Sequence, residues 1–162
     1  MTVTVLVGNP KPQSRTWQAA HLVAERLTGA KPDADIDLAT FGAALLDWSS
    51  TEVAAAVDQV LASDLVVVAS PTYKGAYTGL LKIFLDRIGG GALAGVQAVP
   101  LMLGGGLQHA LAPEVFLKPV LAELGASSPT QGLFLLDSEW DSSETLTNWL
   151  AVARRQLGLE RA

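Results

Sequence analysis

The segment GNPKPQSRT at residues 8–16 carries the side chains of an anion-binding loop, between an apolar run and a helix-like segment. A helix N-terminus attracts an anion through its free amides and its dipole, and either Ser14 or Thr16 can cap this helix. Lys11 and Arg15 add positive charge, so the loop has the chemistry of a phosphate cradle. An ordinary capped helix with solvated basic residues is the alternative, because neither the G-x-G-x-x-G spacing nor the P-loop spacing is present.

The segment SPTYKGAYTGLLKIFLD at residues 70–86 joins another apolar run to an amphipathic helix. Pro71 stiffens the start of this connection. Exposed amides over residues 72–75 suit the edge of a planar heterocycle, whose face Tyr73 or Tyr77 would cover. Both tyrosines can instead pack at a subunit or helix interface, an alternative that weighs more for Tyr77.

A third unusual segment, GGGLQHALAPE, begins at Gly104. Its three consecutive glycines remove side chains where a ligand edge can slide past the backbone, although a flexible turn is the alternative. His109 is a candidate acid or base, but such a histidine more often only caps or packs. Further along, Pro119 lacks the N–H that a helix interior needs, so we expect a kink or a π-bulge before it, and Gly125 marks the helix end.

The elements that position these segments alternate along the chain. Apolar runs predict strands at 3–7, 35–39, 65–69, 98–103 and 131–136, and helix-like segments occupy 15–28, 51–63, 79–88, 113–124 and 143–157. Strict alternation indicates an α/β fold with a parallel sheet and helices on both faces. We therefore expect a flavodoxin-like, doubly wound five-stranded parallel sheet of order 2-1-3-4-5, as a single domain over residues 1–162. In such sheets ligands bind at the carboxyl ends of the strands, where the three segments would meet.

Composition excludes several classes of protein. The chain has 162 residues, of which 49% are hydrophobic and 17% charged, so it is long enough for one packed core. The net charge of −5 and the lack of a basic run argue against nucleic-acid binding. The chain contains no cysteine and only two distant histidines, which argues against a metal site. We find no signal peptide and no membrane span, and expect a cytoplasmic protein.

Together these motifs resemble the NADPH-dependent FMN reductase family of flavodoxin-like proteins. The resemblance is closest to the branch that supplies reduced flavin to sulfonate-degrading monooxygenases. It rests on PTYKGAYTGLLKIFLD, on the glycine run with QHALA, and on LKPVLAELGA. The first loop resembles the family pattern G-S-P-R-x-x-S, with Asn9 in place of serine and Lys11 in place of arginine. Branch members carry an aromatic insertion before the LKP segment that is tied to weak flavin retention, and here that place reads Val115-Phe116.

The resemblance implies a set of cofactor-binding residues and no catalytic side chain, because the flavin carries the chemistry. The FMN phosphate would be held by Asn9, Lys11, Ser14, Arg15 and Thr16. The isoalloxazine ring would be bordered by Pro71, Thr72, Tyr73, Lys74 and Gly75, with Gly104 and Gly105 opposite. The implied cofactors are FMN and NADPH, and the implied activity is hydride transfer from NADPH to FMN, with a flavin-dependent monooxygenase as a candidate partner.

Other functions stay open at this point. A tight-FMN reductase of quinones, azo dyes or metal ions would use the same loops, as would a flavodoxin-type electron carrier. No acidic residue lies between residues 65 and 85 or between 87 and 113, and a neutral to basic rim favours uptake of a whole hydride over electron carriage. A ligand-free interaction module is the remaining alternative. We expect a homodimer or homotetramer, with Trp48, Tyr77 and Trp140 as candidate interface residues or ordinary core.

Overall fold

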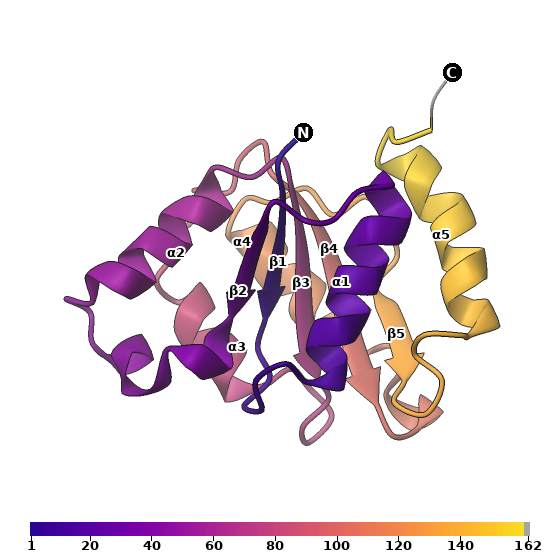
Figure 1. Cartoon of the computed structure of the whole chain (residues 1–162), viewed down its shortest axis with the longest axis horizontal. Coiled ribbons are helices and arrows are strands. Elements are labelled where there is room, and N and C mark those ends of the chain that lie inside the picture. Colours follow the sequence, from indigo (N-terminus) through magenta and orange to yellow (C-terminus); the bar gives the residue numbers. More distant parts are fainter. Residues whose placement is uncertain (161–162) are drawn as a thin grey trace.

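A single parallel sheet forms the centre of the protein in the computed structural model, which describes residues 1–160 (Figure 1). The last two residues of the predicted domain therefore lie outside the described part. The strand order is β2-β1-β3-β4-β5, as the sequence predicts. The strands are β1 (Val3–Val7), β2 (Ala34–Asp37), β3 (Leu65–Pro71), β4 (Gln97–Gly104) and β5 (Leu133–Leu136).

Helices cover both faces of this sheet (Figure 1). The helices are α1 (Arg15–Thr28), α2 (Thr51–Leu61), α3 (Gly79–Leu85), α4 (Lys118–Glu123) and α5 (Glu144–Gln156). Short 3-10 segments are η1 (Leu38–Thr40), η2 (Gly42–Leu46) and η3 (Leu107–His109), and η4 (Pro113–Leu117) is a π-helical turn. One apolar core lies between the sheet and α1 with α5, and the other lies between the sheet and α2, α3, η4 and α4.

The two cores follow from the pleat of the central strands. Every residue of β1 and β3 is buried. Successive side chains of a strand point to opposite faces, so Val5 and Val67 enter one core while Leu6 and Val66 enter the other. This explains why these strands are mostly apolar, with only Thr4 and Ser70 as polar residues, and do not alternate with polar residues.

Hydroxyl side chains start four of the helices. The side-chain oxygens of Ser14, Ser50, Thr78 and Ser143 each accept a hydrogen bond from a backbone amide in the first turn of α1, α2, α3 and α5. A cap of this kind contributes about 1 kcal/mol to stability. The predicted choice between Ser14 and Thr16 as the α1 cap is thus resolved in favour of Ser14.

Most elements differ by one to three residues from the sequence prediction: β3 and β4 are longer, and α2, α3 and α5 are shorter. Three of the differences have a cause that the structure shows. β2 ends at Asp37, whose carboxylate accepts a hydrogen bond from the amide of Ala39 and turns the chain into η1. β5 begins at Leu133, because the two residues before it bond to side chains and not to a strand. The predicted helix 113–124 is divided into η4 and α4, and η4 confirms the disturbance expected before Pro119. No helix within the described residues is long and apolar enough to cross a membrane.

Candidate functional site

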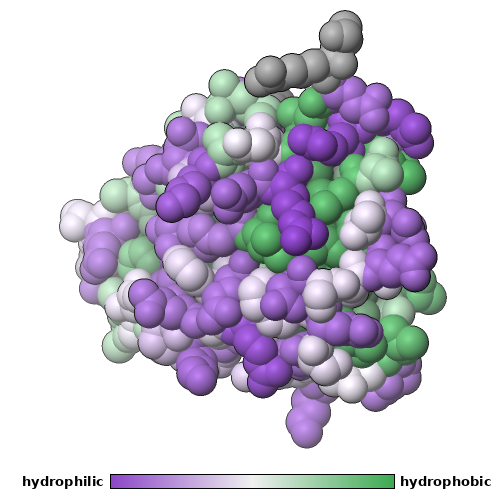
Figure 2. All heavy atoms as spheres, turned by 45° about the vertical axis from the view of Figure 1, so that its right-hand side comes forward, coloured by the Kyte–Doolittle hydropathy of each residue, from purple (hydrophilic) through white to green (hydrophobic). Residues whose placement is uncertain are grey.

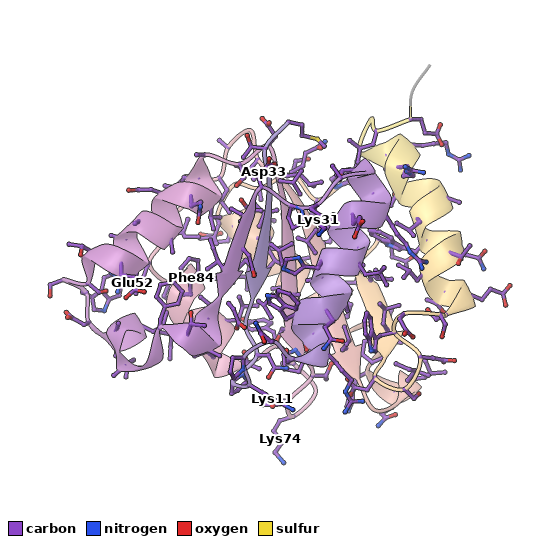
Figure 3. The ribbon with its side chains drawn as sticks, viewed as in Figure 1. Lys11, Lys31, Asp33, Glu52, Lys74 and Phe84 are labelled. Carbon is purple, nitrogen blue, oxygen red and sulfur yellow. The ribbon has the colours of Figure 1, made fainter. Side chains whose placement is uncertain are left out.

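Three loops meet at the carboxyl edge of the sheet, where β1, β3 and β4 end side by side. They are residues 8–14, residues 72–78 and residues 105–106, which follow these three strands. Figure 3 shows Lys11 and Lys74 at this end of the molecule, with Lys74 pointing away from the body. The structure thus brings the three sequence segments to one edge, as the parallel order predicts.

The first loop is shaped by hydrogen bonds between its own side chains. The Asn9 side-chain amide donates to the Thr16 hydroxyl over 3.0 Å, and its oxygen accepts from the Lys11 amide over 2.9 Å. Asn9, Ser14 and Thr16 are buried, whereas Lys11 and Arg15 are exposed. The polar side chains therefore fix the backbone, and the two cations lie at its surface.

This arrangement leaves donors for an anion. The backbone amides of Ser14, Arg15 and Thr16 have no acceptor among the described residues. The Ser14 and Thr16 hydroxyls each accept one hydrogen bond, so each O–H remains able to donate. The Arg15 guanidinium donates to the Asp137 carbonyl over 3.1 Å, which holds it beside the loop that follows β5. These groups fit a phosphate at a helix N-terminus.

Asp37 also shapes the first loop, and the sequence did not predict this role. Its carboxylate accepts a hydrogen bond from the Gln13 amide over 2.9 Å and closes the loop from the end of β2. Gln13 has a positive φ of 49°, a conformation that few residues other than glycine adopt. The one available signal was its position, because Asp37 ends the strand next to β1.

The second loop contains a tight turn. Tyr73 and Ala76 exchange two backbone hydrogen bonds, and the two residues between them, Lys74 and Gly75, have φ values of 53° and 81°. Positive φ at both central positions is typical of a type I′ turn. Glycine is favoured at 75 by its positive φ and not by lack of space, because a Cβ there would lie 3.7 Å from the His109 ring, in ordinary contact.

The tyrosines of this loop have different surroundings. Tyr73 is 52% exposed, whereas Tyr77 packs against the core below α2 and α3. Tyr73 thus remains available to cover a flat ligand. Tyr77 instead packs within the chain, which was the alternative expected for it.

Thr78 joins the second loop to the first. Its hydroxyl donates to the Gly8 carbonyl over 2.5 Å and accepts from the Leu81 amide over 3.1 Å, while its own amide donates to the Ser70 hydroxyl. A side chain at Gly8 would overlap Leu81 of α3. Gly8 therefore allows α3 to approach β1 closely.

The third loop presents two glycines with opposite surroundings. Gly104 is buried, and a Cβ there would lie 2.7 Å from the Phe134 ring and 3.2 Å from the Thr72 hydroxyl. Gly105 is exposed, and its Cβ would meet nothing within 4 Å. The Thr72 hydroxyl is buried and has no hydrogen-bond partner among the described residues. The open backbone at Gly105 fits the edge of a flat ring, whereas the Thr72 hydroxyl lies beneath it, beside the buried Gly104.

Comparison with known proteins agrees with this geometry. A family model described as NADPH-dependent FMN reductase matches residues 1–141. The FMN reductase (NADPH) of Escherichia coli (strain K12) is 34% identical over 145 residues, which cover 86% of this chain and 75% of that protein. The NADH-dependent FMN reductase SfnF of Pseudomonas fluorescens (strain Pf0-1) is 29% identical over an alignment of 169 residues, with coverage of 100% and 90%.

A solved structure gives the same result. The crystal structure of the apo form of the NADH:FMN oxidoreductase EmoB matches with a TM-score of 0.86 and 31% identity, over 99% of this chain and 91% of that one. An NAD(P)H:quinone oxidoreductase from Methanothermobacter marburgensis shares the fold at 18% identity, with a TM-score of 0.67. The resemblance inferred from the three motifs is confirmed, and the chain belongs to the NADPH-dependent FMN reductase family of oxidoreductases.

Proposed function

We propose that this protein transfers a hydride from NADPH to FMN at the edge formed by the three loops, and that it releases the reduced flavin. The nicotinamide supplies the hydride and the flavin accepts it, so the chain needs only to hold the two rings in contact. The observation that carries the proposal is the first loop, where three amides without an acceptor lie beside Lys11 and Arg15.

The residues of the site divide by task. Asn9 fixes the first loop, and Ser14, Arg15 and Thr16 donate hydrogen bonds to the FMN phosphate together with the charge of Lys11. The residues that border the ring are Pro71, Thr72, Tyr73, Lys74, Gly75, Gly104 and Gly105. Among these, the open backbone at Gly105 offers polar contacts at the surface.

The surroundings of the ring favour hydride uptake. No acidic residue occurs in the segments 65–85 and 87–113, which supply the second and third loops. Negative charge near the ring would oppose the reduced anionic flavin, and these two segments carry none. This charge distribution supports a reductase over an electron carrier of very low potential.

Release of the flavin is supported by the π-helical turn η4. It contains Phe116, which is 49% exposed and, like the aromatic insertion of the sulfonate branch, precedes the LKP segment. In that branch the insertion is tied to weak flavin retention. We therefore propose a flavin-dependent monooxygenase as the consumer of the reduced flavin, and a homodimer or homotetramer as the working form. The cytoplasmic location stays a prediction.

The visible absorption spectrum of the purified protein, followed by NADPH addition with and without free FMN, tests this proposal. A colourless protein that oxidises NADPH only when FMN is present is the expected result. A bound-flavin spectrum that NADPH bleaches would replace release by a tight-flavin reductase. No oxidation of NADPH under either condition would overturn the enzyme proposal.

A further inference from the structure

A groove of about 650 Å³ runs along the outer edge of β5. β5 ends the strand order, so it pairs with β4 on one side only. Trp149 and Val152 of α5 belong to one wall, and Leu107 and Ala110 belong to another. None of the residues proposed to bind cofactors lines this groove, so it is separate from the three-loop edge.

Backbone groups along β5 face this groove. The amide of Asp137, directly after the strand, bonds to the Gly104 carbonyl of β4. Successive residues of a strand direct their backbone groups to opposite sides, so the odd-numbered residues of β5 face β4 and the even-numbered ones face away from it. Gly132, Phe134 and Leu136 therefore direct their N–H and C=O groups into the groove.

The chain itself closes both ends of this edge. The Glu114 carboxylate accepts a hydrogen bond from the Gly132 amide over 2.6 Å, and the Glu139 amide donates to the Leu136 carbonyl over 3.1 Å. These contacts occupy the space that a further strand would need, whereas a small molecule fits between them. Within the described chain, the Gly132 carbonyl, both backbone groups of Phe134 and the Leu136 amide have no partner.

The free groups suit the edge of a flat ring. In order along the chain they are an acceptor, a donor, an acceptor and a donor, all directed to the same side. A cyclic amide holds its own C=O and N–H side by side in the plane of its ring, so it matches a neighbouring donor and acceptor of this series. The series extends over about 10 Å of strand, which is enough for two fused rings.

The walls of the groove fit an aromatic compound without charge. The Trp149 indole donates to the Gln131 carbonyl over 2.7 Å, which fixes its ring at the groove wall. Leu107 and Val152 are 68% and 45% exposed, and Figure 2 shows apolar surface among polar surface on this side of the molecule. Glu139 is the one ionisable side chain that lines the groove within the described residues, so a phosphate finds no cation among them. Mostly apolar walls with a few polar groups that fix orientation are typical of small-molecule sites.

We propose that this groove is a second small-molecule site, which binds a flat, uncharged heterocycle with a cyclic amide edge. The amide of the ligand pairs with the free backbone groups of Phe134 and its neighbours, and its ring packs against Trp149 and Leu107. Because the described lining contains no cation, the phosphate-bearing FMN and NADPH are not its preferred ligands. The site therefore goes beyond the proposed hydride transfer and shares no residue with it.

NMR titration of the amide signals with quinazolinone, an uncharged cyclic amide of two fused rings, tests this site. The Phe134 and Leu136 amides and the Trp149 indole should shift, with a dissociation constant of about 1 mM, as for other ligands of this size. The Gly132 amide, which bonds to Glu114, should shift less. The N-methylated compound keeps the ring and loses the N–H donor, so its dissociation constant should be at least about fivefold higher.

Two tryptophan substitutions on α5 separate the groove from general effects on the helix. Val152→Trp places a large ring in the groove, whereas Ala151→Trp places the same side chain at the neighbouring exposed position, which does not line it. Val152→Trp should raise the dissociation constant of quinazolinone at least about tenfold. Ala151→Trp should leave it unchanged. Both positions are exposed, so both variants should fold.

Several results would each overturn the proposal. Phe134 and Leu136 amides that do not shift at millimolar quinazolinone would do so, as would equal affinities for quinazolinone and its N-methylated form. An unchanged affinity of folded Val152→Trp would show that the compound binds elsewhere. Loss of the shifts when FMN is added in excess would assign the compound to the flavin site. NADPH oxidation is measured separately, so failure here leaves the proposed activity standing.

Discussion

Replacing Gly105 by alanine, with the same change at Gly104 as its counterpart, tests whether a flavin ring lies against the third loop. The two glycines are neighbours and receive the same added methyl group. At Gly105 this methyl meets no atom within 4 Å, and at Gly104 it lies 2.7 Å from the Phe134 ring. Neither residue has a positive φ, so alanine fits the backbone at both positions.

The expected magnitudes follow from these distances. Gly104→Ala forces a methyl group into the core, and overpacking of this kind costs about 1–3 kcal/mol of folding stability. Gly105→Ala should change the free energy of unfolding by less than about 0.5 kcal/mol, as for other surface substitutions. If the ring contacts the Gly105 backbone, the methyl must displace it at a similar cost of about 1–3 kcal/mol, which corresponds to a rise of roughly 5- to 150-fold in the FMN dissociation constant.

Titration of FMN fluorescence and thermal unfolding of each variant measure the two quantities. Gly105→Ala should melt like the wild type and bind FMN more weakly. Gly104→Ala should melt at a lower temperature. An FMN affinity of folded Gly105→Ala equal to that of the wild type would show that the ring does not approach this backbone, and the role given to the third loop would be refuted.

Three further predictions concern other residues. Arg15→Ala should raise the FMN dissociation constant about five- to tenfold, since a charged hydrogen bond at an exposed site is worth about 1 kcal/mol. The same variant should bind riboflavin as the wild type does, because riboflavin has no phosphate. Equal effects on both ligands in fluorescence titrations would contradict this prediction. Lys74→Asn should stabilise the protein by about 0.5–1 kcal/mol and so raise its melting temperature, because asparagine adopts positive φ more readily than lysine. A lower melting temperature would count against the assigned turn. Burial raises the pKa of Glu114, but hydrogen bonds from Lys118 and the Gly132 amide lower it more, so that its pKa lies below the ordinary 4.5. This carboxylate therefore stabilises the fold above about pH 4.5 and less as the pH falls through its lowered pKa, so the melting temperatures of wild type and Glu114→Gln should converge as the pH falls below 4.5.

The sequence predicted the sheet because local pattern and long-range order agree in it. The runs at Val3–Val7 and Leu65–Pro71 are buried throughout and almost entirely apolar, with Thr4 and Ser70 as their polar residues, as expected for a strand covered on both faces. The disturbance before Pro119 was also predictable, since a missing N–H acts on the preceding turn whatever surrounds it. The three loops could be selected because the parallel order fixes which strand ends are neighbours.

Features that depend on distant partners could not be predicted in this way. Asp37 closes the first loop through Gln13, and Arg15 reaches the Asp137 carbonyl across more than 120 positions of sequence. The start of β5 was misplaced because Glu114 and Trp149 bond to the residues before it. In each case a side chain from a distant part of the sequence bonds to the backbone, and the periodicity of the sequence does not predict such a bond.

The hydroxyl of Thr78 has a consequence for how proteins of this type diversify. It ties the first loop to the start of α3, and the Thr78 amide adds a bond to Ser70 at the end of β3, so one residue holds the three elements together below the tips of the loops. Insertions at residues 10–12 or at the turn 73–76 lie beyond this tie, so they can lengthen the walls of the site without shifting the strands. A descendant can thus acquire new substrates by changing only the loop tips, while the tie preserves the register of the sheet through each change.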